Sequence, residues 1–192
     1  MKKISFVQSA FTITLLTVIT LLPSTWTLDT AHSNLRFSIT SLMISEVEGS
    51  FKMTEATITA FQEDFADAVV SMTADVNSVN TGEPDRDTHL KSADFFDAAK
   101  YPVIIFKSTS FEKQTDKTYK VTGNLTFHGI TKPVVLEAIA NYGTHPMNKK
   151  SIAGFKITGT IKRTDFGIAT TTPSAMLGDE VAIVANAQFA KN

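Results

Sequence analysis

Histidine is the residue type best suited to metal binding and proton transfer at neutral pH, and the chain has four of them. They stand at His32, His89, His128 and His145, and no two of them form the i, i+3 or i, i+4 pair that places two ligands on one helical face. The chain has no Cys, which excludes thiolate nucleophiles, disulfides and Cys-ligated zinc. The sequence therefore predicts no metal ion and no cofactor.

Arg86, Asp87 and His89 form a compact charged cluster that allows two interpretations. The three side chains could act as acid–base machinery, or they could brace a surface segment through ion pairs, with Arg163 and Asp165 forming similar ties. No nucleophile elbow or other motif supplies an activated nucleophile. We therefore expect no catalytic residue and a protein that is not an enzyme, while an enzyme acting on an apolar substrate stays as the alternative.

Composition and charge narrow the class of ligand. The formal net charge is −1, and Lys and Arg are scattered, so the chain lacks the basic excess that is typical of nucleic-acid binders. Phe is abundant at 14 residues, against one Trp and three Tyr. Because Phe carries no polar group, this choice favours a purely apolar interior surface.

The N-terminus has the pattern of a bacterial signal peptide. Two lysines follow Met1, residues 4–22 are mostly apolar, and Pro23 ends the run. We expect residues 1–25 to be a cleaved signal segment, with an uncleaved membrane anchor at 4–22 as the alternative. Both interpretations place the remaining domain, 26–192, outside the cytoplasm, in the periplasm or secreted.

The elements that must position any site are predominantly strands. Apolar residues alternate with polar ones along most of the chain after residue 26, which predicts strands near 34–40, 46–60, 70–76, 103–112, 119–127, 132–143, 153–161 and 181–189. Short polar turns join these segments, as in an antiparallel meander. We expect an all-β fold, a single closed barrel of about eight strands. The alternation changes phase between Met53 and Ala56, which indicates a β-bulge.

One segment, 84–97, interrupts the strands and is predicted to be helical, because Pro84 suits a first helical turn and Pro102 ends the segment. It is the only helix we expect. We interpret it as a lid over the barrel, with Leu90 and two adjacent phenylalanines facing inward and Arg86, Asp87 and Lys91 outward or at the rim. The alternative is that the phenylalanines anchor the segment to the outside of the barrel.

Several long motifs, in order, resemble those of the YceI-like proteins over essentially all of 26–190. They are Trp26 to Ser33, Gly49-Ser50-Phe51, Ser78 to Gly82, Arg86 to Asp97, Lys100-Tyr101-Pro102, Phe106 to Thr109, Gly123 to Val134, and Lys162 to Ile168. The resemblance implies a lipocalin-like barrel with an elongated apolar cavity that binds a polyisoprenoid or a similar long-chain lipid, such as an isoprenoid quinone. The chain departs from many members at Ser41-Leu42, where those members have a His.

We predict that an apolar wall contacts the lipid, formed by Phe37, Phe51, Leu90, Phe95, Phe96, Phe106, Phe127, Leu136, Phe155, Ile157 and Phe166. Arg86, His89 and Arg163 are candidates for a polar rim that holds the head group, since Arg suits phosphate. Small inward residues such as Gly123, Gly159 and Ala185 would leave space. The alternatives are a packed core serving as a structural module and the enzyme above. A transient membrane contact and a dimer are both compatible with the sequence.

Overall fold

The structure is a computed structural model that describes residues 22–192. The predicted signal segment falls almost entirely on residues outside this range. None of the helices in the described range is long and apolar enough to cross a membrane.

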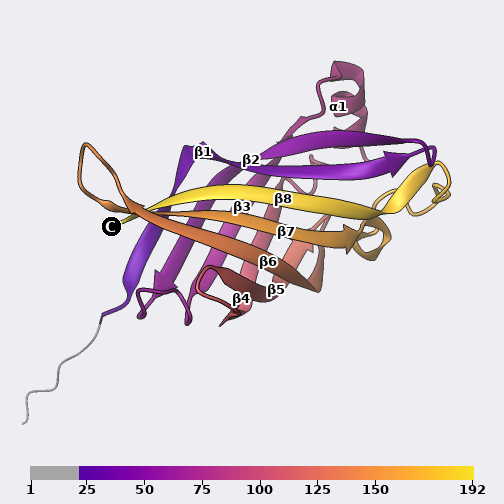
Figure 1. Ribbon diagram of the computed structural model, residues 1–192. Coiled ribbons are helices and arrows are strands. Elements are labelled where there is room, and N and C mark those ends of the chain that lie inside the picture. Colours follow the sequence, from indigo (N-terminus) through magenta and orange to yellow (C-terminus); the bar gives the residue numbers. More distant parts are fainter. Residues whose placement is uncertain (1–21) are drawn as a thin grey trace, which may run out of the picture.

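The chain forms one closed antiparallel barrel of eight strands, with each strand paired to its neighbours in sequence and β8 paired to β1 (Figure 1). The strands are β1 (Ser24–Ser41), β2 (Ser45–Ala60), β3 (Val69–Asn80), β4 (Val103–Lys113), β5 (Thr118–Phe127), β6 (Ile130–Thr144), β7 (Ser151–Lys162) and β8 (Leu177–Lys191). The predicted fold class is confirmed. The first strand begins at Ser24, well before the expected position, because a register shift between Thr27 and Leu35 breaks its alternation.

The predicted β-bulge lies in β2. Its pairing with β3 shifts register between Met53 and Glu55, so two successive side chains of β2 face outward there. Phe51 and Met53 before the shift, and Ala56 and Ile58 after it, are all buried. The extra residue thus keeps one apolar face toward the interior on both sides of the bulge.

Two short helical segments interrupt the strands, where the sequence predicted one. Helix α1 (Pro84–Lys91) lies between β3 and β4, and turns rather than helix continue from Ser92 to Lys100. The one predicted helix is thus confirmed as α1, although it is shorter than expected. The second segment is η1 (Arg163–Phe166), a 3-10 turn after β7 that the sequence did not predict. Gly167, with φ of 69°, ends η1 in the left-handed conformation that glycine adopts readily.

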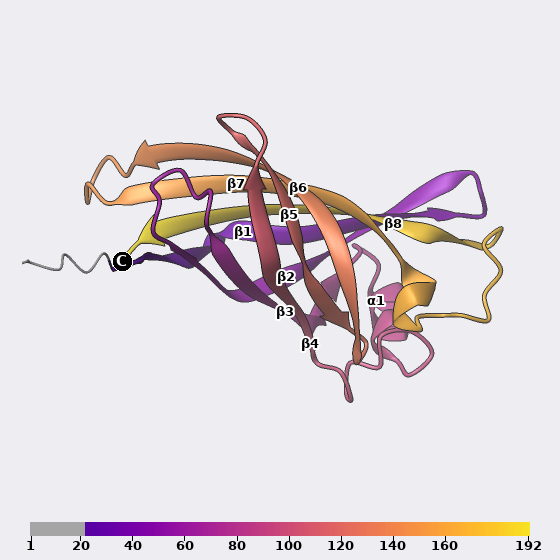
Figure 2. The same ribbon diagram turned by 90° about the horizontal axis from the view of Figure 1, so that it is seen from below.

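The barrel has two distinct ends. At one, which we call the α1 end, lie the β1–β2 hairpin, α1 and the β7–β8 connection (Figures 1 and 2). At the other, the C-terminal end, lie the chain's C-terminus, the β2–β3 loop and the β6–β7 turn. The two longest connections, β3–β4 (81–102) and β7–β8 (163–176), lie at the α1 end, and each carries one helical segment.

Candidate binding cavity

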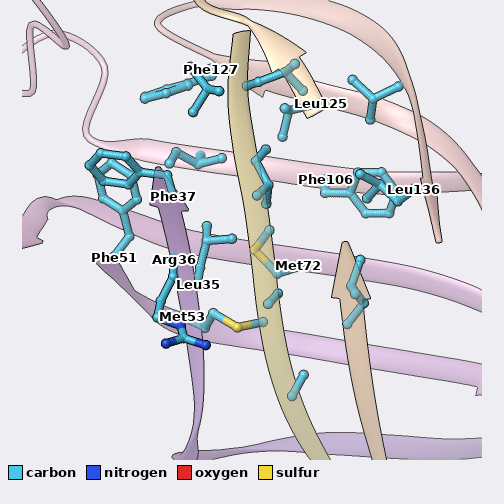
Figure 3. A pocket seen from close by; sticks show the side chains of 18 of the residues that line it. Leu35, Arg36, Phe37, Phe51, Met53, Met72, Phe106, Leu125, Phe127 and Leu136 are labelled. Atoms are coloured by element: carbon cyan, nitrogen blue, oxygen red, sulfur yellow. The ribbon is translucent and has the colours of Figure 1, made fainter. Parts of the chain in front are cut away.

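The barrel is hollow. A cavity of about 410 Å³ lies inside it, within the size range of small-molecule binding sites. Every strand contributes inward side chains to its wall, for example Leu35, Phe51, Met72, Phe106, Leu125, Leu136, Ile157 and Ile183. Figure 3 shows the first six of these pointing into the cavity. The period-two alternation produces this wall, because every second residue of each strand points inward.

The structure places most of the predicted wall in the lining of this cavity. The predicted residues that line it are Phe37, Phe51, Leu90, Phe95, Phe96, Phe106, Phe127, Leu136, Phe155 and Ile157. Phe166 does not. It lies on η1 and is buried, with its ring 6.3 Å from that of Phe127 and outside the cavity lining. The predicted lumen contact of Phe166 is therefore wrong.

Sequence reasoning did not name other residues of the wall. They include Leu35, Ile39, Val47, Met53, Ile58, Met72, Ile104, Phe111, Val181 and Ile183. Leu35, Ile39, Val47, Met53 and Ile104 share the inward phase of their strands with residues that were named. Met72, Val181 and Ile183 lie on β3 and β8, where no wall residue was named, although the alternation of those strands contained the same signal.

Glycines let bulky side chains lie flat against the wall. The pairs are Phe37 on Gly49, Phe106 on Gly123 and Leu136 on Gly159, each joining neighbouring strands. In each pair, a Cβ atom added to the glycine would lie 2.4 Å from the bulky side chain, far closer than contact permits. With any larger residue at the glycine, the ring or methyl group would have to move. These glycines therefore help to keep the interior empty.

Polar side chains are few in the lining: three arginines, one histidine and one serine. They are Arg36, Ser41, Arg86, His89 and Arg163. Within residues 22–192, no Asp or Glu lines the cavity. The wall can thus accommodate hydrocarbon along most of its surface and interact with a polar or anionic group only at these few positions.

Arg86 and His89 are exposed residues of α1 that line the cavity, so the cavity opens to the surface here. We call this opening the mouth. Arg86 donates to the hydroxyl and carbonyl oxygens of Thr81, at 2.8 and 3.0 Å, and Asp87 accepts from the Thr81 backbone N–H and hydroxyl group. The expected ion-pair brace is wrong, because Thr81 stands between the two charges. The His89 ring packs edge-on against Phe95, with centroids 4.8 Å apart.

Arg163 lines the cavity but is not free to hold a head group. Only 3% of its surface is exposed, and its guanidinium donates five hydrogen bonds to backbone carbonyl oxygens. The acceptors are Gly178, Ile168, Ala169, Thr172 and Leu177. Since a guanidinium has five N–H groups, none remains for a ligand. The predicted rim contact of Arg163 and its tie to Asp165 are both replaced by this role in holding the β7–β8 connection.

Asp179 fastens the same connection from outside. Its carboxylate accepts from the backbone N–H of Thr164 at 3.2 Å and from the Thr164 hydroxyl at 2.7 Å. The Thr164 hydroxyl bond is the main cause that lowers the pKa of Asp179 below its ordinary value.

The C-terminal end of the cavity is closed by Phe65, which projects from the β2–β3 loop and is 1% exposed. Its ring lies 5.0 Å from that of Trp26, 5.4 Å from Phe155 and 5.6 Å from Tyr142, onto which it stacks. Trp26 and Phe65 do not line the cavity but lie beyond its last lining residues. These contacts close the barrel at this end.

Hydrogen bonds hold the loop that carries Phe65. The Tyr119 hydroxyl donates to the Asp64 carbonyl oxygen at 2.7 Å and lies 2.6 Å from the Tyr142 hydroxyl. Burial, with this bond to Tyr119, raises the pKa of Tyr142 far above its ordinary value. An ion pair between Lys113 and Asp64, at 2.8 Å, ties the loop to β4. The cavity is therefore open at the α1 end and closed at the C-terminal end.

The family model of the YceI-like domain matches residues 26–189. "Protein YceI" of Salmonella newport strain SL254 is 41% identical over 140 residues, covering 72% of each chain. "UPF0312 protein SA2479" of Staphylococcus aureus strain N315 is 36% identical over 169 residues, which is 85% of this chain and 96% of that protein.

Solved structures show the same barrel. BcnA of Burkholderia cenocepacia has a TM-score of 0.72 at 25% identity, covering 84% of this chain and 98% of its own. The Campylobacter jejuni YCEI protein has a TM-score of 0.62 at 26% identity, covering 100% of this chain and 99% of its own. A polyisoprenoid binding domain from Saccharophagus degradans has a TM-score of 0.62, covering 87% of this chain and 98% of its own. It is only 16% identical, so this likeness shows the fold alone.

Proposed function

The chain belongs to the YceI-like family, and from this premise we propose that it is an exported protein that holds one long apolar lipid in its barrel. The lipid class we favour is a polyisoprenoid or an isoprenoid quinone. The family motifs in the sequence support this choice, and one neighbour that shares the fold is described as a polyisoprenoid binding domain. The role would be transport, storage or sequestration of the lipid outside the cytoplasm.

The observation that carries the proposal is the apolar cavity with its few polar residues. Burying hydrocarbon contributes about 0.8 kcal/mol per CH₂ group, so a chain of about ten such groups gains roughly 8 kcal/mol before the costs of association. A wall of Phe, Leu, Ile and Met supplies this gain without directional contacts. A packed structural module would have no need of glycines that hold side chains against its wall.

The position of the mouth gives the lipid an orientation. Arg86 and His89 stand at the opening, while the lining at the other end consists of apolar residues such as Phe111, Phe155 and Phe189. A head group with phosphate or carbonyl oxygens would stay at the mouth, where Arg86 offers a cation, and the hydrocarbon would extend inward. We propose binding rather than catalysis, because the lining residues contain no carboxylate that could pair with His89 in proton transfer.

The experiment is native mass spectrometry of the full chain, followed by solvent extraction and identification of the released lipid. We expect one isoprenoid-type molecule per barrel. In a matched pair of variants, Ala138→Phe should exclude the lipid, because Ala138 lines the cavity, and Ile139→Phe on the outer face should retain it. Circular dichroism verifies that both variants fold. A wild-type barrel that releases no lipid and takes up none would overturn the proposal.

A further inference from the structure

Four exposed apolar residues gather at the α1 end of the barrel. Leu42, Met43 and Ile44 form the turn of the β1–β2 hairpin and are 58%, 73% and 86% exposed. Met176, in the β7–β8 connection, is 56% exposed, and its carbonyl oxygen accepts from the Leu42 backbone N–H at 3.0 Å. We call these four residues the apolar tip. Apolar side chains clustered and exposed in this way mark a surface that contacts another apolar phase.

The backbone of the hairpin makes this choice of residues unusual. Leu42 and Met43 have φ values of 51° and 60°, and the Ile44 N–H donates to the Ser41 carbonyl oxygen at 3.1 Å. Two positive φ values at the centre of a hairpin turn normally select Asn, Asp or Gly. Here the turn carries large apolar side chains in a conformation that costs them energy. This cost gives no benefit to the folded barrel, because the side chains point into solvent.

The apolar tip adjoins the mouth. Ser41 and Val47 flank the hairpin turn, Leu177 follows Met176, and all three line the cavity. Figures 1 and 2 show that the β1–β2 hairpin and the β7–β8 connection reach farther than α1 at this end of the molecule. A flat apolar phase that approached this end would therefore meet the tip first, and the tip would bring it to the mouth.

We propose that the apolar tip inserts into the surface of a lipid bilayer with uncharged or zwitterionic head groups, and that the ligand passes between bilayer and cavity there. The transfer of ligand in this inference rests on the proposed function. Glu46, Glu48 and Asp179 flank the tip and disfavour anionic head groups. A second copy of the chain is a poorer partner, since a stable dimer needs about 20–30 residues a side and the tip is small and convex.

The test uses the absence of Cys from the sequence. A single introduced Cys is then the one site in the full-length chain that a thiol-reactive fluorophore labels. An environment-sensitive fluorophore is attached at Ser45→Cys beside the tip, or at Lys150→Cys at the C-terminal end. Vesicles of phosphatidylcholine are then added, alone or mixed with phosphatidylglycerol. We expect a blue shift at position 45, little change at position 150, and weaker binding to the anionic mixture. Changing both Met43 and Ile44 to Ser should weaken vesicle binding about tenfold per residue.

Met147→Ser is the matched control, because Met147 is 87% exposed in the β6–β7 turn at the opposite end. It should leave the response at position 45 unchanged. The proposal is overturned by no response at position 45, by an equal response at position 150, or by a shift that depends on protein concentration without vesicles. If the protein binds vesicles as expected but never holds lipid, the proposed function is refuted and the proposal of membrane docking still stands.

Discussion

Single residues determine how much of the barrel interior stays open. The Phe37 ring lies over Gly49 so closely that an added Cβ would approach its ring atoms at 2.4 and 2.7 Å. The next atom is a methyl carbon of Thr81, at 2.9 Å, so the three nearest obstacles all belong to side chains. A side chain at position 49 would therefore displace the Phe37 ring toward the lumen.

We accordingly expect Gly49→Ala to reduce the amount of lipid bound per barrel several-fold while the protein remains folded. Gly154→Ala on β7 is the matched control, because nothing lies within 4 Å of the Cβ it would add. Lipid content is measured by extraction and mass spectrometry of both variants. Equal lipid content in the two variants would show that Phe37 yields in another direction and that its glycine does not shape the cavity.

Arg163 makes a different kind of contribution, since its hydrogen bonds stabilise the β7–β8 connection. Arg163→Lys replaces five donors in a fixed fork by three on one nitrogen, which leaves buried carbonyl groups without partners. We expect a loss of about 3 kcal/mol in the free energy of unfolding. Urea titration measures this loss. Arg36→Lys, at an exposed position, should change stability little, and an equal loss there would contradict the assignment.

At the scale of elements, the segment after α1 combines a core residue and a mouth residue side by side. Phe96 is 7% exposed, and its ring lies 5.2 Å from Phe127 and 5.6 Å from Phe51. Phe95 is only partly buried and contacts His89 at the mouth. Both line the cavity, but only Phe96 is packed among aromatic rings of the barrel on several sides.

Substitution of the two phenylalanines should therefore have different effects. Phe96→Ala should lower the free energy of unfolding by about 3–5 kcal/mol, as loss of a core phenylalanine does. Phe95→Ala should cost much less stability and instead speed the release of lipid. Thermal unfolding and dilution-driven release of a fluorescent lipid measure the two effects. If both variants lose stability equally and keep lipid normally, the segment is plain core and has no role as a lid.

Strand-level features could be predicted because each depends on local alternation. The bulge near Thr54 follows from the change of phase between Met53 and Ala56, and the structure has it there. The five partners of Arg163 could not be found in this way. Three are carbonyl groups of the irregular β7–β8 connection, whose path no residue pattern specifies, and two belong to the first residues of β8. Phe65 is similar: it lies in a loop with φ of 57°, outside any periodic run, so no sequence signal marked it as the residue that closes the barrel.

At the scale of the whole molecule, the two ends of the barrel have different roles: one is open and the other is closed. The hairpin turn, α1 and the β7–β8 connection surround the open α1 end, whereas Phe65 and the Tyr119–Tyr142 pair fasten the C-terminal end. Stability of the closure should therefore depend on a single loop residue.

Phe65→Ala tests this dependence, with Phe61→Ala as the control in the same loop, because Phe61 is 54% exposed and Phe65 is 1% exposed. We expect the first to cost about 3–5 kcal/mol and the second to fall within about 0.5 kcal/mol of the wild type. Denaturant midpoints give both values. A small cost for Phe65→Ala would mean that the neighbouring rings close the gap without it.

A tube that is sealed at one end also imposes a sequence of events on any linear molecule inside it. The end of the lipid that enters first is the last to leave, so loading and unloading follow the same path in opposite order. A molecule with a polar group at both ends would have to leave one of them beside Phe111, Phe155 and Phe189, at a cost of roughly 2–7 kcal/mol for an unpaired group. The barrel would thus select linear lipids that have a polar group at one end only. Any part of the lipid longer than the cavity is deep would remain outside.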